Sequence, residues 1–465
     1  MSVIVTIGEK LRIQNAPPEI EQWCKEHLVL NNPEYAKKVR MGFWVGNTPK
    51  TLTLYEKDGD TLVLPYGCFA DIYHYLAPMS SFRTSFSTSF HVDFGGDVPL
   101  YDYQKTAVDQ MVEATYGILQ SPAGSGKTQM GIALAAKLGR RTLWLTHTKD
   151  LLNQSKSRAA QYFASKDFGV ISEGKVSIGR TITFATVQTM SNLDLTQYRN
   201  CWDCVIVDEC HRVSGTPTSV SQFSKVLNNL AARHKYGLSA TVHRADGLIQ
   251  ATYALLGNVA HIVPDEAVSF KVMSVEVHPI RTGAGITLDC LNPDGTINYA
   301  KTITHITQNI SRNVLISRLL TLESNRFCLI LSDRVAHLKQ LYELLPEELR
   351  AKAAVIDGKM TTKRGKRERE EAIEKMRTGE NHFLFATYAL AKEGLDIPRL
   401  DRLFLTTPQK DYAVIVQSIG RVARTFPGKT QPIAYDFVDC SRGFEKSFRT
   451  RCTHYRKCGC TIKEV

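Results

Sequence analysis

The sequence predicts an α/β protein: two doubly wound parallel-sheet domains in tandem, preceded by a small β-rich (α+β) domain. Two series of short apolar runs lead to this prediction, because each run has the length of a buried strand and is followed by a segment with helical character. The first series begins near Leu100 and the second near Asn325. We expect the domains to be 1–95, 96–264 and 265–465.

Residues 1–95 are expected to form an accessory domain. Two alternating runs flank residues 57–60 (KDGD), a turn-forming tetrapeptide that predicts a β-hairpin. Residues 80–90, rich in Ser, Phe and Thr, are expected to link this domain to the next one. Four aromatic side chains lie at strand spacing, where aromatic residues more often fill a core than stack on nucleic-acid bases: Phe43, Trp44, Tyr55 and Tyr66.

Residues 121–128 (SPAGSGKT) lie between an apolar strand-like run and a helical run. A strand, a loop of small residues and a helix, in that order, are typical of a phosphate loop, whose backbone N–H groups close around phosphate oxygens. We expect Lys127 to reach the β and γ phosphates and the Thr128 hydroxyl to ligate Mg²⁺. Ser121 stands where the pattern has Gly, but the flanking strand and helix support the assignment.

Two carboxylates follow a second apolar run, at Asp208 and Glu209. Acidic residues at a strand end are often only a solvated terminus. After a phosphate loop, however, phosphoryl transfer needs a metal ligand and a group that orients water, and these two residues fit those roles. Transfer also needs cations, for which Arg421 and Arg424 are the candidates. They lie three apart on a predicted helix over 417–424 and hence on one face, although such a pair can also simply face solvent.

The region 270–310 lacks clear helical periodicity and contains two turn-forming segments, TGAG and NPDG. We therefore place the junction between the two sheet domains near Pro264.

Five segments, in this order along the chain, resemble the motif set of superfamily 2 helicases. They are SPAGSGKT (121–128), DECH (208–211), SAT (239–241), EGLDIP (393–398) and QSIGRVAR (417–424). The resemblance implies two RecA-like domains that use ATP and Mg²⁺. It also implies that LYDYQ (100–104) reads adenine, with Gln104 able to pair with the base edge.

The resemblance assigns roles residue by residue. Binding of the nucleotide is implied for Tyr103, Gln104, Pro122, Ala123, Gly124, Ser125, Gly126, Lys127, Thr128, Gly394 and Asp396, with Thr128 and Asp208 on Mg²⁺. Catalysis is implied for Lys127, Asp208, Glu209, His211, Gln417, Arg421 and Arg424. Coupling is implied for Ser239, Ala240 and Thr241. Contacts to a nucleic-acid strand are implied for Thr146, Thr186, Gln188, Ser332, Arg334 and Thr387, although a hydroxyl after a strand is as often a helix cap.

The β-rich N-terminal module and the run GLSATVHRADG (237–247) make the chain similar to phage recombination helicases of the UvsW type. Val242 and Cys210 depart from common forms of the motifs, which affects the subfamily more than the activity. This resemblance implies ATP-dependent unwinding or branch migration of branched or forked DNA in recombination, repair or replication. Three alternatives stay open: an RNA helicase, a duplex translocase without strand separation, and a nucleic-acid-binding module without enzymatic activity.

Composition agrees with a polyanionic partner, because 58 Lys and Arg residues against 46 Asp and Glu residues give the 465-residue chain a charge of +12. A modest excess of this kind also serves solubility. The absence of a long apolar segment and of a signal-peptide layout leads us to expect no membrane contact and a place in the cytosol, that of the host cell if the chain is phage-encoded. We also expect a monomer.

The 11 cysteines show no disulfide spacing, and reduced thiols are expected. Cys201 and Cys204 form a C-x-x-C that leads into a strand, so core packing is the better account. A C-terminal group has ligand types that suit zinc but no standard zinc spacing, which leaves a zinc site open: Cys452, His454, Cys458 and Cys460.

Overall fold

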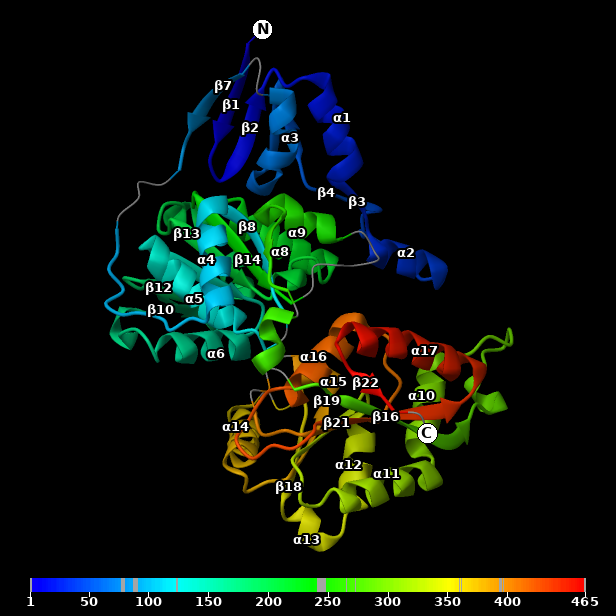
Figure 1. Ribbon diagram of the computed structural model, residues 1–465. Helices are drawn as coiled ribbons and strands as arrows, with labels where there is room; N and C mark the ends of the chain where they lie inside the picture. Colours follow the sequence, from blue (N-terminus) through cyan, green and yellow to red (C-terminus); the bar gives the residue numbers. More distant parts are fainter. Residues whose placement is uncertain are drawn as a thin grey trace. The chain divides into compact units, whose positions relative to one another are not determined.

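The computed structural model describes residues 2–76, 80–86, 91–122, 124–240, 248–264, 266–271, 273–358, 360, 362–392, 395 and 397–463 (Figure 1). The chain forms two compact units, Met1–Ala267 and Val268–Val465, and each is described by itself. The three-domain division expected from the sequence stays a proposal.

A five-stranded sheet begins the first unit, in the order β5-β6-β2-β1-β7. Its strands are β1 (Val3–Ile7), β2 (Lys10–Gln14), β5 (Glu56–Asp58), β6 (Thr61–Pro65) and β7 (Ser80–Thr84). The predicted hairpin is confirmed, because β5 and β6 pair antiparallel across Gly59, whose φ is +58°. The expected linker is wrong in its first part, since β7 pairs parallel with β1 and belongs to the sheet.

Helices α1 (Pro18–His27) and α3 (Phe69–Leu76) pack on this small sheet. Tyr66 is 4 % exposed and lies in the same core, with Tyr55 packed against it. The segment between α1 and β5 holds β3 (Val29–Asn31), α2 (Pro33–Arg40) and β4 (Thr51–Thr53). Phe43 and Trp44 lie in the loop after α2, so their predicted strand is wrong: positive φ angles at Gly42 and Gly46 turn the chain there.

The rest of the first unit is an eight-stranded sheet in the order β11-β10-β12-β9-β13-β14-β8-β15. All neighbouring strands in it are parallel except β10 and β11. The strands are β8 (Tyr116–Gln120), β9 (Thr142–Thr146), β10 (Gly169–Ser172), β11 (Lys175–Ser177), β12 (Ile182–Thr186), β13 (Cys204–Asp208), β14 (His234–Ser239) and β15 (Val259–Ile262).

Helices cover both faces of this sheet, as the buried apolar runs predict. Trp144 of β9 faces Gly131 of α5, while its neighbours Leu143 and Leu145 share a core with Phe223 of α8. The helices are α4 (Asp102–Ala114), α5 (Lys127–Leu138), α6 (Lys149–Ala159), α7 (Val187–Ser191), α8 (Pro217–Leu227) and α9 (Ile249–Leu256).

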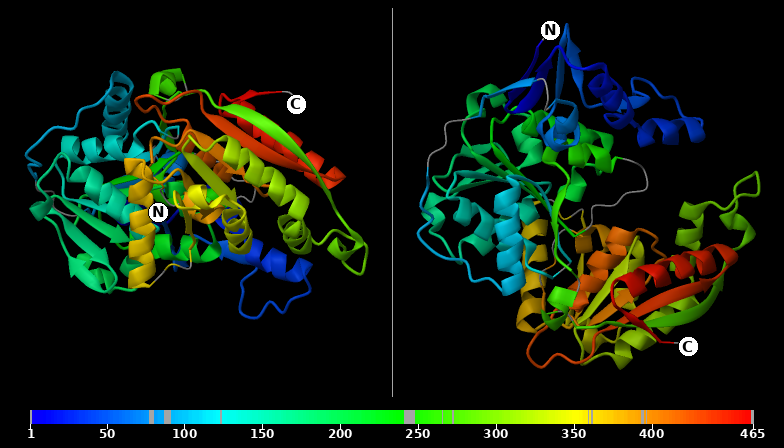
Figure 2. Two further views of the ribbon diagram at one scale, coloured as in Figure 1. Left: turned by 90° about the horizontal axis from the view of Figure 1, so that it is seen from below. Right: turned by 45° about the horizontal axis from the view of Figure 1, so that its top comes forward.

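The second unit is a seven-stranded parallel sheet in the order β18-β19-β17-β20-β21-β16-β22. Its strands are β16 (Glu276–Gly285), β17 (Cys328–Ser332), β18 (Ala353–Ile356), β19 (Phe383–Thr387), β20 (Arg402–Leu405), β21 (Ile433–Cys440) and β22 (Thr461–Ile462). Its helices are α10 (Tyr299–Gln308), α11 (Ile310–Leu322), α12 (Val335–Glu343), α13 (Glu347–Arg350), α14 (Lys363–Thr378), α15 (Tyr388–Lys392), α16 (Tyr412–Val422) and α17 (Arg442–Lys457). Figure 2 shows α11 and α12 on one face of the sheet and α16 and α17 on the other, in agreement with two separate cores.

The predicted fold class, two tandem parallel α/β sheets behind a small α+β domain, is confirmed. The interpretation of 270–310 is wrong, because β16 and α10 lie within it. The TGAG segment is part of β16. The pairing register of β16 with β21 shifts between Arg281 and Gly285, and Gly283 between them has a φ of +72°. NPDG does form a turn, with the Asn292 N–H donating to the Thr296 carbonyl at 2.8 Å.

The described residues include no helix that is long and apolar enough to cross a membrane. They also include no group of three or more His, Cys, Asp or Glu side chains suited to a metal ion, so the zinc site left open above is not formed there. His454 instead lies 3.3 Å from the Lys410 carbonyl, and Cys460 is buried in the core of the second unit. None of the eleven cysteines, all of which are among the described residues, forms a disulfide; Cys204 is buried in the core of the first unit, and Cys201 packs against that core.

Candidate active site

Three neighbouring strands of the first unit bring predicted site residues to one edge of the sheet. β8 runs into the phosphate loop (residues 121–128), Asp208 ends β13 and Ser239 ends β14. In the register, Asp208 lies opposite Leu238, and Ser239 lies opposite Gln120. Parallel strands end on the same edge, so the loop, the carboxylates and the first SAT residue are neighbours, as in other open α/β sheets.

The phosphate loop turns through two glycines in left-handed backbone conformation, Gly124 and Gly126, each with φ +85°. Helix α5 begins directly afterwards at Lys127, so its free N–H groups point into the loop. The Lys127 ammonium donates to the carbonyls of Ser121 and Pro122, at 3.2 Å each. A cation held over a glycine cradle at a helix start fits a polyphosphate.

Ser121, the departure from the usual pattern, has a structural role. Its hydroxyl donates to the Ser125 hydroxyl at 2.5 Å, and both residues are fully buried. This bond spans the loop and joins its first residue to its fifth. Ala123 of the loop lies outside the described residues.

Gln104 supports the loop from the side. Its amide N–H donates to the Ser125 carbonyl at 2.8 Å, and its Oε1 accepts the Tyr101 N–H at 3.0 Å. The Tyr103 hydroxyl donates to the same Ser125 carbonyl at 2.7 Å. A Cβ at Gly126 would lie 2.6 Å from the Gln104 amide nitrogen, and the φ of +85° favours glycine there independently of this contact. The Gln104 amide thus faces the loop in this structure, and its adenine-reading role stays a prediction.

Asp208 is held by two hydrogen bonds. Its Oδ2 accepts the Ser155 hydroxyl and its Oδ1 accepts the Glu209 N–H, both at 3.0 Å. Burial and, second, the neighbouring Glu209 charge raise the pKa of Asp208 to about 6, although the Ser155 hydrogen bond and Lys127 oppose the shift. Two carboxylates in a site of low dielectric attract a cation, so Asp208, with Thr128 in the first turn of α5, fits Mg²⁺. A bound Mg²⁺ would neutralise charge on phosphate oxygens.

A chain of side chains leads from the carboxylates to β14. The Glu209 Oε2 lies 3.2 Å from Nδ1 of His211, and that nitrogen lies 3.1 Å from the Ser239 hydroxyl. Glu209 itself has φ +50°, an uncommon conformation for a residue other than glycine and one that recurs at functional sites. Ala240 follows in a bend, and Thr241 lies outside the described residues.

The predicted strand contacts of the first unit are largely engaged within the protein. The fully buried Thr146 hydroxyl donates to the Thr148 carbonyl at 3.0 Å, and the Thr186 hydroxyl lies 2.9 Å from that of Thr189. Gln188 is only partly buried, and its amide nitrogen lies 3.2 Å from Nδ1 of His147. Burial and the nearby Arg212 lower the pKa of His147. His147 is not among the site residues predicted from the sequence, although it directly follows Thr146, which is.

Ser332 of the second unit, also predicted to contact a nucleic-acid strand, is likewise engaged within the protein. Its buried hydroxyl accepts the Arg334 N–H at 3.1 Å and lies 3.0 Å from Nδ1 of His337, so it closes the turn into α12. Arg334 and Thr387 are half-buried, each at the carboxyl end of its strand or just after it. Their contacts to nucleic acid stay predictions.

The two arginines do not share a helix face. Helix α16 ends at Val422, so Arg421 lies in its last turn and Arg424 beyond it. Ala423 caps the helix: its N–H donates to the Ile419 carbonyl, and its own carbonyl accepts the Met273 N–H at 2.6 Å. Arg421 donates to the carbonyls of Ala391 (3.1 Å) and Leu395 (3.2 Å), beside Gly394 and Asp396, which lie outside the described residues.

Gln417 lies one turn before Arg421 on α16. Among the described residues, its buried Oε1 has no hydrogen-bond partner. A buried acceptor without a partner is uncommon in a folded protein and marks a position suited to a donor that arrives with a ligand.

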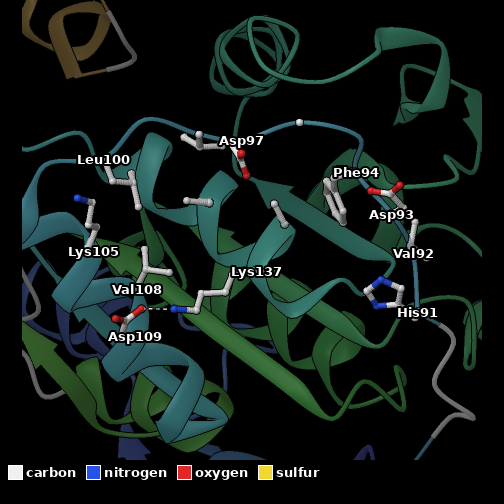
Figure 3. Close-up of a pocket in the computed structure, with 14 residues that line it drawn as sticks. His91, Val92, Asp93, Phe94, Asp97, Leu100, Lys105, Val108, Asp109 and Lys137 are labelled. Atoms are coloured by element: carbon white, nitrogen blue, oxygen red, sulfur yellow. Dashed lines mark hydrogen bonds and ion pairs between the residues drawn. The ribbon is translucent and has the colours of Figure 1, made fainter.

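A hollow of about 500 Å³ lies away from these residues, where segment 91–100 crosses α4 and α5 (Figure 3). The Lys137–Asp109 ion pair lines it. The segment is fixed on both sides, since the Val92 N–H donates to the Gly139 carbonyl at 2.8 Å and Phe94 packs edge-on against Phe163. Because none of the predicted site residues lines the hollow, we assign it to the packing of the connecting segment.

Comparison with known proteins finds two family models. Residues 97–244 match "Type III restriction enzyme, res subunit", and residues 311–426 match "Helicase conserved C-terminal domain". The putative ATP-dependent RNA helicase L396 of Acanthamoeba polyphaga mimivirus is 26 % identical over 354 residues, 75 % of this chain and 65 % of that protein. The putative DNA 3'-5' helicase Rad25 of Halobacterium salinarum is 24 % identical over 387 residues, 78 % of this chain and 58 % of that protein.

The chain therefore spans less than two thirds of the length of these relatives. Among solved structures, T4 UvsW aligns over 100 % of this chain and 99 % of its own, with 19 % identity and a TM-score of 0.43. The two matched models lie in order on the two parallel-sheet units. The chain belongs to the superfamily 2 helicases.

Proposed function

We propose that this chain is an ATP-dependent DNA helicase or translocase that unwinds or branch-migrates branched DNA in recombination, repair or replication. The observation that carries the proposal is the contact chain Glu209–His211–Ser239 beside the phosphate loop. These contacts join Glu209, the residue proposed to orient water, to Ser239. Ser239 ends β14 and begins the SAT segment (239–241), which is proposed to couple hydrolysis to movement. A motor needs such a connection, since ATP moves an equilibrium only through its differential affinity for two states.

In this proposal, Lys127, Thr128 and Asp208 hold the phosphates and Mg²⁺, and Glu209 orients the attacking water. Charge neutralisation and positioning supply most of the rate enhancement of phosphoryl transfer. The roles of Gln417, Arg421 and Arg424 toward ATP rest on the family resemblance alone.

DNA is the preferred substrate on two grounds. The model matched by the first sheet domain describes a restriction enzyme subunit, and Rad25 of Halobacterium salinarum is described as a putative DNA helicase. The mimivirus relative is described as an RNA helicase, so RNA is the second candidate. The charge of +12 suits either polyanion.

The test is the rate of ATP hydrolysis at one fixed salt concentration with four ligands: single-stranded DNA, linear duplex, forked DNA and single-stranded RNA. Salt is fixed because phosphate contacts are salt-dependent. We expect the strongest stimulation by the fork. Strongest stimulation by RNA or by plain duplex would replace this proposal with an RNA helicase or a duplex translocase.

Two variants of helix α5 make the test specific. Lys127→Ala removes the cation of the phosphate loop and is expected to lower hydrolysis by at least 100-fold, within the range that one preorganised donor supplies. Lys137→Ala, at the exposed end of the same helix, is the matched control and should hydrolyse ATP like the wild type. Unwinding by Lys127→Ala at the wild-type rate would overturn the proposal.

A further inference from the structure

Residues 32–50 form a compact excursion from the N-terminal domain. Two hydrogen bonds of Asn32 connect the two ends of this segment. The Asn32 side-chain amide donates to the Pro49 carbonyl at 2.8 Å, and the Asn32 backbone N–H donates to the Lys50 carbonyl at 3.0 Å. The excursion contains α2, which has no buried residue and extends beyond β3 and β4 (Figure 1). Its base is therefore fixed, while its outer part contributes to no core.

Four apolar side chains of the excursion face solvent. Val39 is 56 %, Met41 51 %, Phe43 63 % and Trp44 87 % exposed. Scattered exposed apolar residues are ordinary, but four within six positions form a patch of the kind that marks an interaction site.

Trp44 is the most exposed of these four side chains, at 87 %. Gly46 has φ +52° and turns the chain close to the indole, since a Cβ on it would lie 3.0 Å from the ring. The indole is therefore open to solvent, and a planar partner can stack on it without displacing another side chain.

The same short segment carries an excess of cations. The excursion contains four basic side chains and one acidic side chain, Glu34, whose carboxylate is already paired with Lys38 at 3.4 Å. Lys37, Arg40 and Lys50 are exposed. Aromatic rings beside uncompensated cations are the two components of sequence-independent binding to single-stranded nucleic acid.

We infer that Phe43 and Trp44 stack on unpaired bases of a DNA branch, while Lys37, Arg40 and Lys50 contact the flanking phosphates. An apolar protein partner would match the aromatic rings but not the three cations around them. The inference rests on the proposed DNA function and adds to it the residues that recognise unpaired bases outside the two sheet domains.

Tryptophan fluorescence tests the contact directly in the full chain. Trp144 and Trp202 are buried, and Trp23 is half-buried with its ring already stacked on His27, so stacking on Trp44 should produce most of the quenching when unlabelled forked DNA is added at fixed salt. We expect this quenching in the wild type and its loss in Trp44→Phe, which should keep binding within about threefold because phenylalanine also stacks. Quenching of equal amplitude in Trp44→Phe would overturn the inference.

Binding affinity supplies the second measurement. The double variant Phe43→Ala, Trp44→Ala should bind forked DNA at least about tenfold more weakly, as expected for the loss of two stacked bases, and blunt duplex within twofold of the wild type. Leu288→Ala, whose side chain is 86 % exposed in the second unit, is the matched control and should bind both like the wild type. Wild-type affinity of the double variant for the fork, or quenching by forked RNA alone, would overturn the inference.

The two proposals fail separately. DNA-stimulated ATP hydrolysis together with normal fork binding by the double variant would overturn only the role of Phe43 and Trp44. Absence of stimulation by every nucleic acid would overturn the proposed function, whatever the fluorescence shows.

Discussion

Nδ1 of His211 lies 3.1 Å from the hydroxyl of Ser239, which joins the strand end that carries Asp208 and Glu209 to the end of the next strand of the sheet. The same nitrogen lies 3.2 Å from Glu209. The imidazole therefore contacts the group proposed to orient water and the first residue of the SAT segment at once. A displacement of Glu209 that follows a change at the bound phosphates would therefore be transmitted through His211 to Ser239 at the end of β14.

Ser239→Ala should separate hydrolysis from movement. The change removes the contact to His211 but leaves Glu209, Asp208 and Lys127 in place. We expect ATP hydrolysis within about threefold of the wild type and strand displacement at least about tenfold slower. The measurement is the number of ATP molecules hydrolysed per base pair separated; an unchanged ratio would contradict the role of this contact.

Ser121→Ala should loosen the phosphate loop. It deletes the buried hydrogen bond to Ser125, which contributes about 1 kcal/mol to the free energy of unfolding. All four tryptophans, Trp23, Trp44, Trp144 and Trp202, lie in the first unit, so urea unfolding followed by their fluorescence reports on that unit alone. We also expect a higher KM for ATP. The exposed Ser157→Ala is the control, and equal stability of the two variants would contradict the role of the bond.

The sequence was sufficient for the phosphate loop and for both parallel sheets, because these depend on contiguous patterns: an apolar strand, a loop of small residues and a helix. It was insufficient for contacts that only tertiary structure creates. Ser155 donates to Asp208 across 53 positions, and nothing around Ser155 distinguishes it from any other helical serine.

Strand β16 shows why the start of the second unit was missed. It pairs with β21 on one side and only with the two-residue β22 on the other. Its residues alternate between partly exposed and buried from Glu276 to Ile280, and Arg281 and Gly283 are exposed. The expectation of continuous apolar runs suits strands that are covered on both faces, such as β17 and β20, and fails near a sheet edge.

Protons and Mg²⁺ should compete at Asp208. Burial raises its pKa to about 6, so below that pH the carboxyl is mostly protonated and cannot ligate a cation. The Mg²⁺ concentration that gives half-maximal ATP hydrolysis should therefore rise as pH falls from 7.5 to 5.5, by up to about tenfold per pH unit below the pKa. Titrations of Mg²⁺ at several pH values measure this, and a Mg²⁺ requirement independent of pH would contradict the assignment of Asp208.

The last prediction concerns Lys235, which is 1 % exposed and lies where the N-terminal sheet domain meets the first parallel sheet. Its ammonium donates to the carbonyls of Glu9 (3.1 Å) and Leu227 (2.7 Å) and lies 5.4 Å from the centre of the Tyr66 ring. Burial lowers the pKa of Lys235 to about 7, whereas an unfolded lysine titrates near 10.5.

Between these two values the unfolded chain binds more protons than the folded one, so the free energy of unfolding should rise with pH, by up to about 1.4 kcal/mol per pH unit from this group. Urea unfolding of the first unit at pH 7 and pH 9, followed by tryptophan fluorescence, measures the slope. In Lys235→Met the lysine contribution to the slope should vanish, while the exposed Lys166→Ala should keep it. A wild-type slope in Lys235→Met would assign the pH dependence to another group and contradict the depressed pKa.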